Sequence, residues 1–317
     1  ADRALADRQT AVGASQLEDA RHETARELLR GWFAWLRARD EARAAHEQTA
    51  LAAQLADTVR RRVQAGDAAA MDGALAGAEL ERVRAQALLA RSHVDLAAAW
   101  ITQRFPEITL AVPDEPPARA NDASIPATPP PTERERLRTA YVERHHELAL
   151  ARAEARRASA QVERARAELR PDPSIGAYLA SDRGAAERVL GIGVSLPLAG
   201  PARDAALRQA LADEQARIES ARDIERRVLA SFDRDWVELT ARTAAAFAFA
   251  QAASAQQDAA RQIGRAYALG ESSLPDWLAA RRVAGDARAQ ALSARCDAAE
   301  TAARLRLDLH QLPGFDD

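Results

Sequence analysis

The chain has 317 residues, of which 44 are basic and 47 acidic, for a net charge of −3. This near balance gives no sign of a polyanionic partner such as a nucleic acid. The single cysteine, Cys296, excludes an intrachain disulfide and a thiolate metal cluster. No run of 18 apolar residues occurs, so the sequence predicts no transmembrane helix.

The placement of proline divides the chain into long helical runs and one linker. Eight of the 14 prolines fall within residues 106–131, a segment that cannot be helical throughout and reads as an extended linker. The sequence predicts long helices over residues 1–64, 73–104, 132–170, 202–264 and 276–310. These lengths exceed those of ordinary globular helices and favour coiled-coil-like hairpins.

An internal repeat relates the two halves of the chain. At an offset of 204 residues, the stretch RAQAL at 84–88 falls on RAQAL at 288–292. The same offset places Gly66 on Gly270, Asp72 on Asp276 and Trp32 on Trp236. Residues 1–105 and roughly 205–309 are therefore predicted to be two copies of one helix–turn–helix unit, with turns at 64–72 and 269–276.

Two short segments between the helices alternate apolar and small residues instead. PDPSIGAYLASDRG at 171–184 and ERVLGIGVSLPLAG at 187–200 predict two strands joined by a hydrophilic loop. A membrane-spanning strand is apolar toward lipid and small or polar toward the lumen. In that interpretation Gly191, Gly193 and Ser195 face inward, and the lipid-facing residues are Leu190, Ile192, Val194, Leu196 and Leu198. The same pattern also fits a soluble hairpin packed against helices, and both interpretations stay open.

Two stretches resemble the TolC-like outer-membrane efflux family, the exit ducts of tripartite exporters. GVSLPLAGPARDAALRQALADEQARIESA is a strand ending in Ser-x-Pro-Leu, followed by a short turn and a long helix. YALGESSLPDWL fits the turn pattern of the family through Tyr267, Gly270, Ser273, Asp276 and Leu278. RPDPSIG followed by ERVLGIGVSLPL is most similar to the heavy-metal (cation) efflux branch. The resemblance extends over nearly the whole chain.

The resemblance implies a mainly α fold, with long antiparallel helical hairpins in two repeats and one β-hairpin that contributes to a trimeric membrane β-barrel. It implies a passive channel in the outer membrane of a Gram-negative bacterium, with most of the chain in the periplasm. The partners would be a periplasmic adaptor protein, an inner-membrane pump, outer-membrane lipid and two further copies of the chain. The expected segments are a first helical repeat (1–105), a Pro-rich linker (106–131), a helix leading to the strands (132–170), a membrane β-hairpin (171–200) and a second helical repeat (201–317).

The resemblance also implies roles for the turns. The residues that would meet the adaptor are Gly66, Asp67, Gly270, Glu271 and Ser273. Asp72 and Asp276 would lie at the entrance of the duct, where acidic groups favour the passage of cations. Both aspartates also precede a helical run, so helix capping explains them too, and both roles can hold.

One departure from the family pattern bears on the pore. The family has a strand hairpin in each repeat, whereas this sequence shows one, and residue 1 aligns with residue 205, just past the strands. The counterpart of residues 132–204 would then be missing, so a truncated, non-conducting member of the family is one alternative. A soluble helical-hairpin scaffold or interaction protein is another.

The remaining polar residues form no catalytic or metal-binding pattern. His145 and His146 are adjacent and diverge by about 100° on a helix, so they cannot chelate one ion together. The other four histidines are scattered without ligand spacing: His22, His46, His93 and His310. No P-loop, Cys-x-x-Cys or Ser/His/Asp grouping occurs. We therefore expect no enzyme activity, no bound metal and no cofactor.

Overall fold

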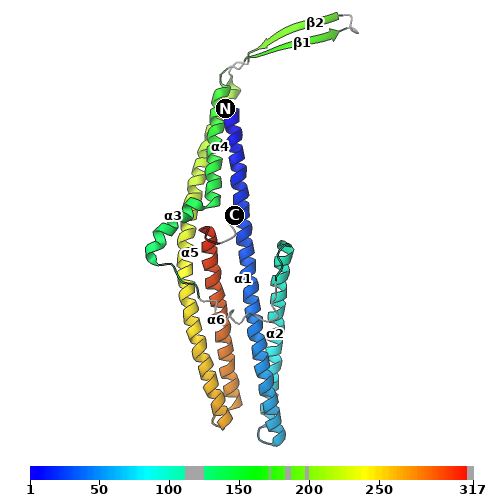
Figure 1. Ribbon diagram of the computed structural model, residues 1–317, viewed down its shortest axis with the longest axis vertical. Coiled ribbons are helices and arrows are strands. Elements are labelled where there is room, and N and C mark those ends of the chain that lie inside the picture. Colours follow the sequence, from blue (N-terminus) through cyan, green and yellow to red (C-terminus); the bar gives the residue numbers. More distant parts are fainter. Residues whose placement is uncertain (111–124, 171–172, 183–186, 197–199, 313–317) are drawn as a thin grey trace. The chain divides into compact units, whose positions relative to one another are not determined.

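Long helices dominate the protein, with one pair of strands between them (Figure 1). The computed structural model describes residues 1–110, 125–170, 173–182, 187–196 and 200–312. The elements are α1 (Asp2–Ala65), α2 (Ala70–Arg104), a 3-10 turn (Pro131–Glu133), α3 (Arg134–Arg144), α4 (His146–Glu168), β1 (Ser174–Asp182), β2 (Glu187–Ser195), α5 (Pro201–Leu269) and α6 (Leu274–Asp308). The predicted mainly α fold with one β-hairpin is confirmed. Among the described helices, none combines the length and the apolar composition needed to cross a bilayer.

The chain folds into two compact units. Unit 1 contains Ala1–His22 and Thr139–Ser231, and unit 2 contains Glu23–Arg138 and Phe232–Asp317. The long helices α1 and α5 and the short helix α3 contribute to both units, because one unit boundary falls inside each of them. Unit 2 therefore holds both helical turns, and unit 1 holds the strands.

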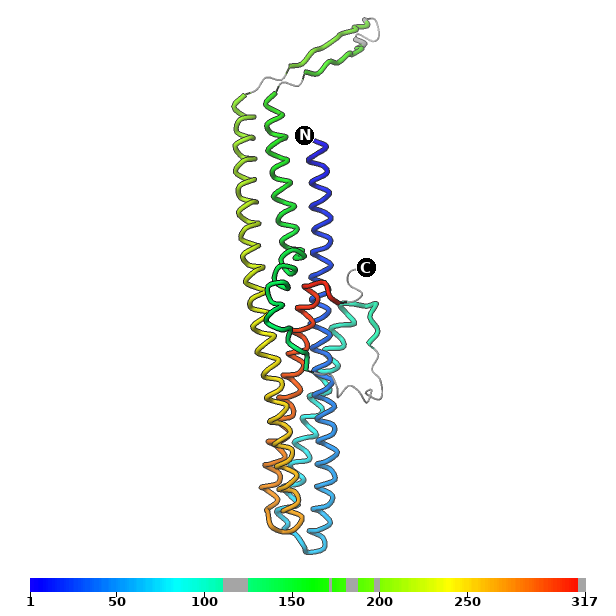
Figure 2. Tube along the Cα trace, turned by 60° about the vertical axis from the view of Figure 1, so that its left-hand side comes forward, coloured from blue at the N-terminus to red at the C-terminus, as the bar shows by residue number. Residues whose placement is uncertain are grey.

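The helices of unit 2 begin and end at matching positions in the two halves of the chain. α1 ends at Ala65 and α5 at Leu269, while α2 and α6 cover positions 70–104 and 274–308. All of these bounds agree with an offset of 204 residues. Within unit 2, α1 lies beside α2 and α5 lies beside α6, and both turns are at the same end (Figures 1 and 2).

Two apolar clusters stabilise unit 2. One joins α1 to α2 away from the turns and consists of Trp35, Ala38, Val94 and Ile101. The other joins the two repeats near the turns and consists of Leu55, Val59, Ala76, Leu274 and Leu278. Because the second cluster takes residues from α1, α2 and α6, the two helical hairpins share a core at their turn ends.

Unit 1 differs from the sequence prediction at one point. A single helix was expected over residues 132–170, but α3 ends at Arg144 and α4 begins at His146. His145 breaks the helix with an extended ψ of 117°. Its buried ring lies 5.4 Å from that of Tyr141, whose hydroxyl in turn is 3.2 Å from the hydroxyl of Ser231 on α5. The prediction was wrong here because packing between helices, not a proline or glycine, ends α3.

β1 and β2 form an antiparallel hairpin with an unbroken register. The pairs run from Ser174 opposite Ser195 to Asp182 opposite Glu187. In the described part of the chain each strand pairs only with the other. Each strand therefore has one edge whose backbone groups meet no further strand, which is the arrangement that another strand can extend.

Candidate functional site

Helices α1 and α5 end in the same glycine-based motif, which begins the turn to the next helix. Gly66 and Gly270 have φ angles of +82° and +80°. In the first turn the N–H of Gly66 donates to the carbonyl of Val63 (3.1 Å), and the N–H of Asp67 donates to the carbonyl of Arg62 (2.8 Å). The second turn repeats both bonds at the same lengths. This is a Schellman motif, in which glycine is favoured because no Cβ opposes the left-handed backbone.

The structure exposes every residue that was predicted to contact an adaptor. All five are solvent-accessible and lie at or directly after the two turns: Gly66, Asp67, Gly270, Glu271 and Ser273. They form a surface that is rigid in its backbone, because the Schellman bonds hold both chain reversals. A contact of these residues with an adaptor remains a prediction.

The two predicted entrance aspartates start their helices in different ways. Ser273 is the N-cap of α6: its Oγ accepts from the N–H of Asp276 (3.2 Å) and donates to the Asp276 carboxylate (2.5 Å). Asp276 thus takes part in a reciprocal cap with the serine as cap residue. Asp72 lies in the first turn of α2, whose N-cap, Ala69, makes no side-chain bond. Its negative charge is favourable at that helix end because of the helix dipole.

An aromatic pair holds the second turn against the first repeat. The rings of Tyr267 and Trp277, on either side of the turn, lie 5.1 Å apart. Arg62 of α1 stacks over Tyr267 at 5.4 Å, and Arg281 lies over Trp277 at 5.9 Å. Trp277 also packs on Gly264, where an added Cβ would lie 2.7 Å from its indole nitrogen. These contacts fix the turn of α5 and α6 from both repeats.

Glu79 of α2 is a buried carboxylate that binds arginines from both repeats. Arg82, on the same helix, donates to it at 2.7 and 3.0 Å, and Arg282 of α6 donates at 3.0 Å. Burial alone would raise the pKa of Glu79, but the hydrogen bonds and charges of Arg82 and Arg282 outweigh it and lower the pKa. Glu79 therefore stays ionised and links the two hairpins near their turns.

A row of ion pairs joins α1 to α6 along unit 2; we call it the α1–α6 seam. Its members are Arg26 with Asp308 (2.8 Å), Arg37 with Asp297 (2.5 Å), Asp40 with Arg295 (3.2 Å) and Glu47 with Arg288 (2.6 Å). As the residue numbers rise on α1 they fall on α6, so the two helices are antiparallel along the seam. The first and second repeats are thus joined by charge for most of the length of α6.

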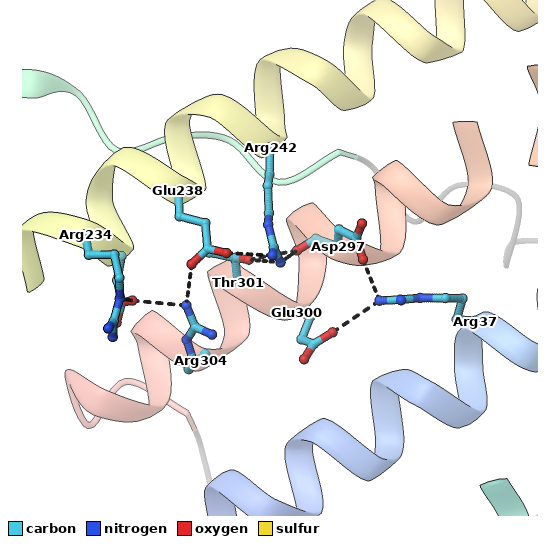
Figure 3. Close-up of polar contacts among 9 residues, drawn as sticks. Arg37, Arg234, Glu238, Arg242, Asp297, Glu300, Thr301 and Arg304 are labelled. Carbon is cyan, nitrogen blue, oxygen red and sulfur yellow. Dashed lines mark hydrogen bonds and ion pairs between the residues drawn. The ribbon is translucent and has the colours of Figure 1, made fainter. Parts of the chain in front are cut away.

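The centre of the seam continues into α5. Figure 3 shows Arg37 reaching from α1 toward Asp297 and Glu300 of α6. On the other side of α6, Arg304 binds the buried Asp235 of α5 at 3.1 Å. Burial raises the pKa of Asp235, against the charge of Arg304, and burial also raises the pKa of Glu300, against the charge of Arg37. The arginines therefore favour the ionised form of both carboxylates against the effect of burial.

The hairpin has one apolar face and one face of small residues. The register places Ile175 opposite Val194, Ala177 opposite Ile192 and Leu179 opposite Leu190, all on one face because strand side chains alternate. The large members of this face are strongly exposed, for example Ile192 at 77%. Leu196 is also exposed but lies just after the end of β2, and Leu198 is outside the described residues. The predicted alternation is therefore present, and lipid contact remains a prediction.

The small-residue face contains one aromatic side chain, which the sequence did not single out. Tyr178 lies opposite Gly191, and its ring covers that glycine so closely that an added Cβ would collide with it. Gly176 and Gly193 on the same face have open space above them. An aromatic ring over a cross-strand glycine shields the exposed backbone there.

Two histidines that look unrelated in the sequence come together in unit 1. The rings of His22 on α1 and His146 on α4 lie 4.9 Å apart. The sequence shows His22 as isolated and His146 only beside His145, and the packing of α1 on α4 that brings the two rings together cannot be read from spacing along the chain. Their proximity corrects that interpretation.

Solved structures match nearly the whole chain, although no protein-family model and no curated protein matches it. The outer-membrane channel OprN is similar with a TM-score of 0.78 at 19% identity, covering 97% of this chain and 70% of that one. The MtrE outer-membrane channel of Neisseria gonorrhoeae gives 0.73 at 20% identity, covering 96% and 70%. CusC, solved in work on transmembrane channel formation, gives 0.78 at 14% identity, covering 97% and 73%. The chain therefore has the fold of the TolC-like outer-membrane channels.

Proposed function

We propose that the chain is a subunit of an outer-membrane exit duct, through which small solutes or metal cations pass out of the periplasm of a Gram-negative bacterium. The observation that carries this proposal is the two-faced hairpin, on a chain that shares its fold with outer-membrane channels. An exposed face of Ile175, Leu179, Leu190, Ile192 and Val194 is costly in water and favourable in lipid. The duct performs no chemistry, and an inner-membrane pump supplies the driving force.

The free edges of the hairpin support assembly from several copies. In a bilayer every backbone N–H and C=O must find a partner, so strands span membranes only in closed barrels. The described hairpin has an open edge on β1 and another on β2. Strands of further copies would satisfy both edges, and we propose that three copies form the duct.

The exposed turns support a periplasmic partner. The surface at Gly66, Asp67, Gly270, Glu271 and Ser273 has a fixed backbone and is not covered by the described chain. We assign it to contact with the hairpin of a periplasmic adaptor protein. The acidic residues there, together with Asp72, would favour cations at the entrance, in agreement with a heavy-metal efflux role.

Membrane insertion tests the proposal through a charge placed on either face of β2. Ile192→Arg and Val194→Arg put a guanidinium on the apolar face, which costs about 2–4 kcal/mol near the middle of a bilayer. Gly193→Arg is the matched control, because Gly193 lies between these two residues on the opposite face of the strand and has open space above it. The wild type and Gly193→Arg should stay in carbonate-washed outer membranes and conduct ions in planar bilayers, and the other two variants should do neither. Equal insertion of all four proteins, or a wild type that is a monodisperse monomer without detergent, would contradict the proposed exit duct.

The cation preference is tested separately by reversal potentials in a salt gradient. Asp72→Asn is the cleaner change, because the Asp276 carboxylate also takes part in the Ser273 cap. The variant should be less selective for cations than the wild type. Asp95→Asn, an exposed aspartate further along α2, is the control and should leave the reversal potential unchanged. Equal reversal potentials for all three proteins would show that Asp72 does not line the entrance of the duct.

A further inference from the structure

The two histidine rings that meet in unit 1 come from different helices. Within that unit the first part of α1 lies beside α4 (Figures 1 and 2). His22 is on α1 and His146 is the first residue of α4, and their ring centres are 4.9 Å apart with the ring planes tilted by 51°. Both residues are half-buried, so a dissolved ion can reach them. The proposed exit duct uses neither ring.

The break between α3 and α4 determines where His146 lies. In a continuous helix, adjacent residues differ by about 100° in direction. His145 instead has an extended ψ of 117°, and its buried ring lies 5.4 Å from the ring of Tyr141. His146 is therefore left at the first position of α4. Leu148, two residues further on, is only 1% exposed and holds this end of α4 in place, so a fixed backbone presents His146 to His22.

The spacing of the two rings fits a shared metal ion. A ligand nitrogen of His22 and one of His146 lie within 4.8 Å of each other. Two nitrogens on one tetrahedral Zn²⁺ ion, each about 2.0–2.1 Å from it, are about 3.4 Å apart. The two nitrogens therefore have to approach by at most about 1.4 Å, which rotation about the side-chain bonds supplies. Imidazole nitrogen is a ligand for ions such as Zn²⁺, Cu²⁺ and Ni²⁺, whereas Mg²⁺ and Ca²⁺ prefer oxygen.

The chain next to the two histidines is acidic within unit 1. Within four residues of either histidine, this unit has four acidic residues and two arginines, an excess of two negative charges. The acidic residues are Glu18, Asp19, Glu143 and Glu147, and the arginines are Arg21 and Arg144. Arg21 is already paired with Glu18 at 3.0 Å. The surroundings therefore favour a divalent cation, because opposite charges attract at short range.

We propose that His22 and His146 together bind one divalent transition-metal ion of the class of Zn²⁺ and Cu²⁺, which links α1 to the start of α4. Water completes the coordination, and Cu²⁺ binds more tightly than Zn²⁺, as it does at nitrogen sites in general. The expectation of no bound metal followed from spacing along the chain, which misses ligands that packing brings together. The inference does not depend on the exit duct, because it uses no residue of the turns or of the β-hairpin.

Equilibrium dialysis of the EDTA-treated, detergent-solubilised full chain against ZnCl₂ tests the site. The wild type should bind one Zn²⁺ ion per chain. His22→Gln and His146→Gln should each bind it at least about 10-fold more weakly, because even the loss of a group that only orients a ligand costs about 10- to 100-fold. His46→Gln removes an exposed histidine from the same helix as His22 and is the matched control, which should bind as the wild type does. Equal affinities for all four proteins, or the same loss in His46→Gln, would overturn the site.

Chemical modification of the wild type is a second test that needs no variant to fold. Zn²⁺ should protect His22 and His146 from diethylpyrocarbonate, as read by peptide mass spectrometry, and should leave the exposed His46 and His93 reactive. Mg²⁺ at the same concentration should protect none of them, because it prefers oxygen ligands. Equal protection of all four histidines, or equal protection by Mg²⁺, would overturn the proposal.

The spectrum of bound Cu²⁺ separates a ligand from a residue that only supports the fold. With one equivalent of Cu²⁺, electron spin-echo modulation should show at least two coupled imidazoles in the wild type and one fewer in His22→Gln and in His146→Gln. His46→Gln should give the spectrum of the wild type. A single coupled imidazole in the wild type would overturn the shared site and leave the two rings as an ordinary contact between helices.

These outcomes separate the inference from the proposed function. A chain that binds Zn²⁺ through His22 and His146 but neither inserts into membranes nor conducts ions would leave the metal site intact and remove the exit duct. A chain that conducts ions and binds no Zn²⁺ would do the reverse.

Discussion

The buried carboxylate of Glu79 on α2 accepts a 3.0 Å hydrogen bond from the Arg282 guanidinium on α6, so a single charge joins the two repeats beside their turns. Glu79 is only 7% exposed, and Arg82 occupies its other oxygen at 2.7 Å. A carboxylate held by two arginines at this depth contributes to stability mainly because removing it leaves their donors unpaired. The link is therefore a sensitive probe of how firmly the hairpins are held together.

Glu79→Gln should lower the free energy of unfolding by about 1–2 kcal/mol at neutral pH, because hydrogen bonds to a charged group are lost. The pKa of Glu79 is lowered from 4.5, so its contribution is present above pH 4.5 and is lost as the pH falls through the lowered pKa. Thermal unfolding in detergent, followed by circular dichroism, should show the difference at pH 7 and lose it as the pH falls through the lowered pKa of Glu79. Glu81→Gln, an exposed neighbour paired with Arg84, should change the midpoint little. A pH-independent gap between Glu79→Gln and the wild type would contradict the role of the charge.

Gly270→Ala should destabilise the second turn by about 1–2 kcal/mol, because an L side chain at a φ of +80° is strained. Gly77→Ala is a control of opposite sign: Gly77 lies inside α2 with open space around it, so alanine should stabilise the helix by about 0.5–1 kcal/mol. The two unfolding midpoints should move in opposite directions from the wild type. Loss of stability in both variants would show that the left-handed turn is not the reason for the glycine.

The features that follow local rules could be predicted from the sequence. The turns at Gly66 and Gly270 could be predicted because both lie between long helical runs, and because the two glycines recur at an offset of 204 residues. The two faces of β2 were found because Leu190, Ile192 and Val194 alternate with small residues. The strand signal acts within about ten residues along the chain, where spacing determines geometry, whereas the turn signal comes from the internal repeat.

The features that depend on packing between distant helices could not be predicted. A chain with 44 basic and 47 acidic residues offers many possible ion pairs, so composition does not select the partners in the α1–α6 seam. The register between α1 and α6 selects them, and that register is set by the shared core at the turns. The break at His145 could not be predicted either, because no proline or glycine marks it in the sequence.

Arg37→Met should destabilise unit 2 by about 1–3 kcal/mol at neutral pH, because Asp297 and Glu300 lose their shared partner. Burial already raises the pKa of Glu300, and Arg37 opposes that effect. Without Arg37 the pKa of Glu300 rises further. The ionised Glu300 carboxylate then destabilises the folded protein at neutral pH, and this cost disappears as the carboxylate is protonated at low pH. The deficit of Arg37→Met relative to the wild type should therefore shrink on acidification. Arg60→Met, which loses only the exposed contact with Asp57 on the same helix, is the control and should show little deficit at any pH. A deficit that grows toward low pH would contradict this account.

Gly191→Val should destabilise the hairpin, because the Tyr178 ring occupies the space that a side chain would need. Because Tyr178 is 58% exposed, its ring can turn away, and the cost is then the loss of the cover that the ring gives to the strand backbone. Gly193→Val is the matched control: it lies two residues along β2 on the same face, and nothing lies within 4 Å of an added Cβ. The urea concentration that extracts the protein from lipid vesicles should be lower for Gly191→Val than for the wild type and unchanged for Gly193→Val. Tyr178→Ala in the Gly191→Val background should restore it, because the displaced ring is then gone. If the double variant is no more stable than Gly191→Val, the Tyr178 ring is not the reason that position 191 requires glycine.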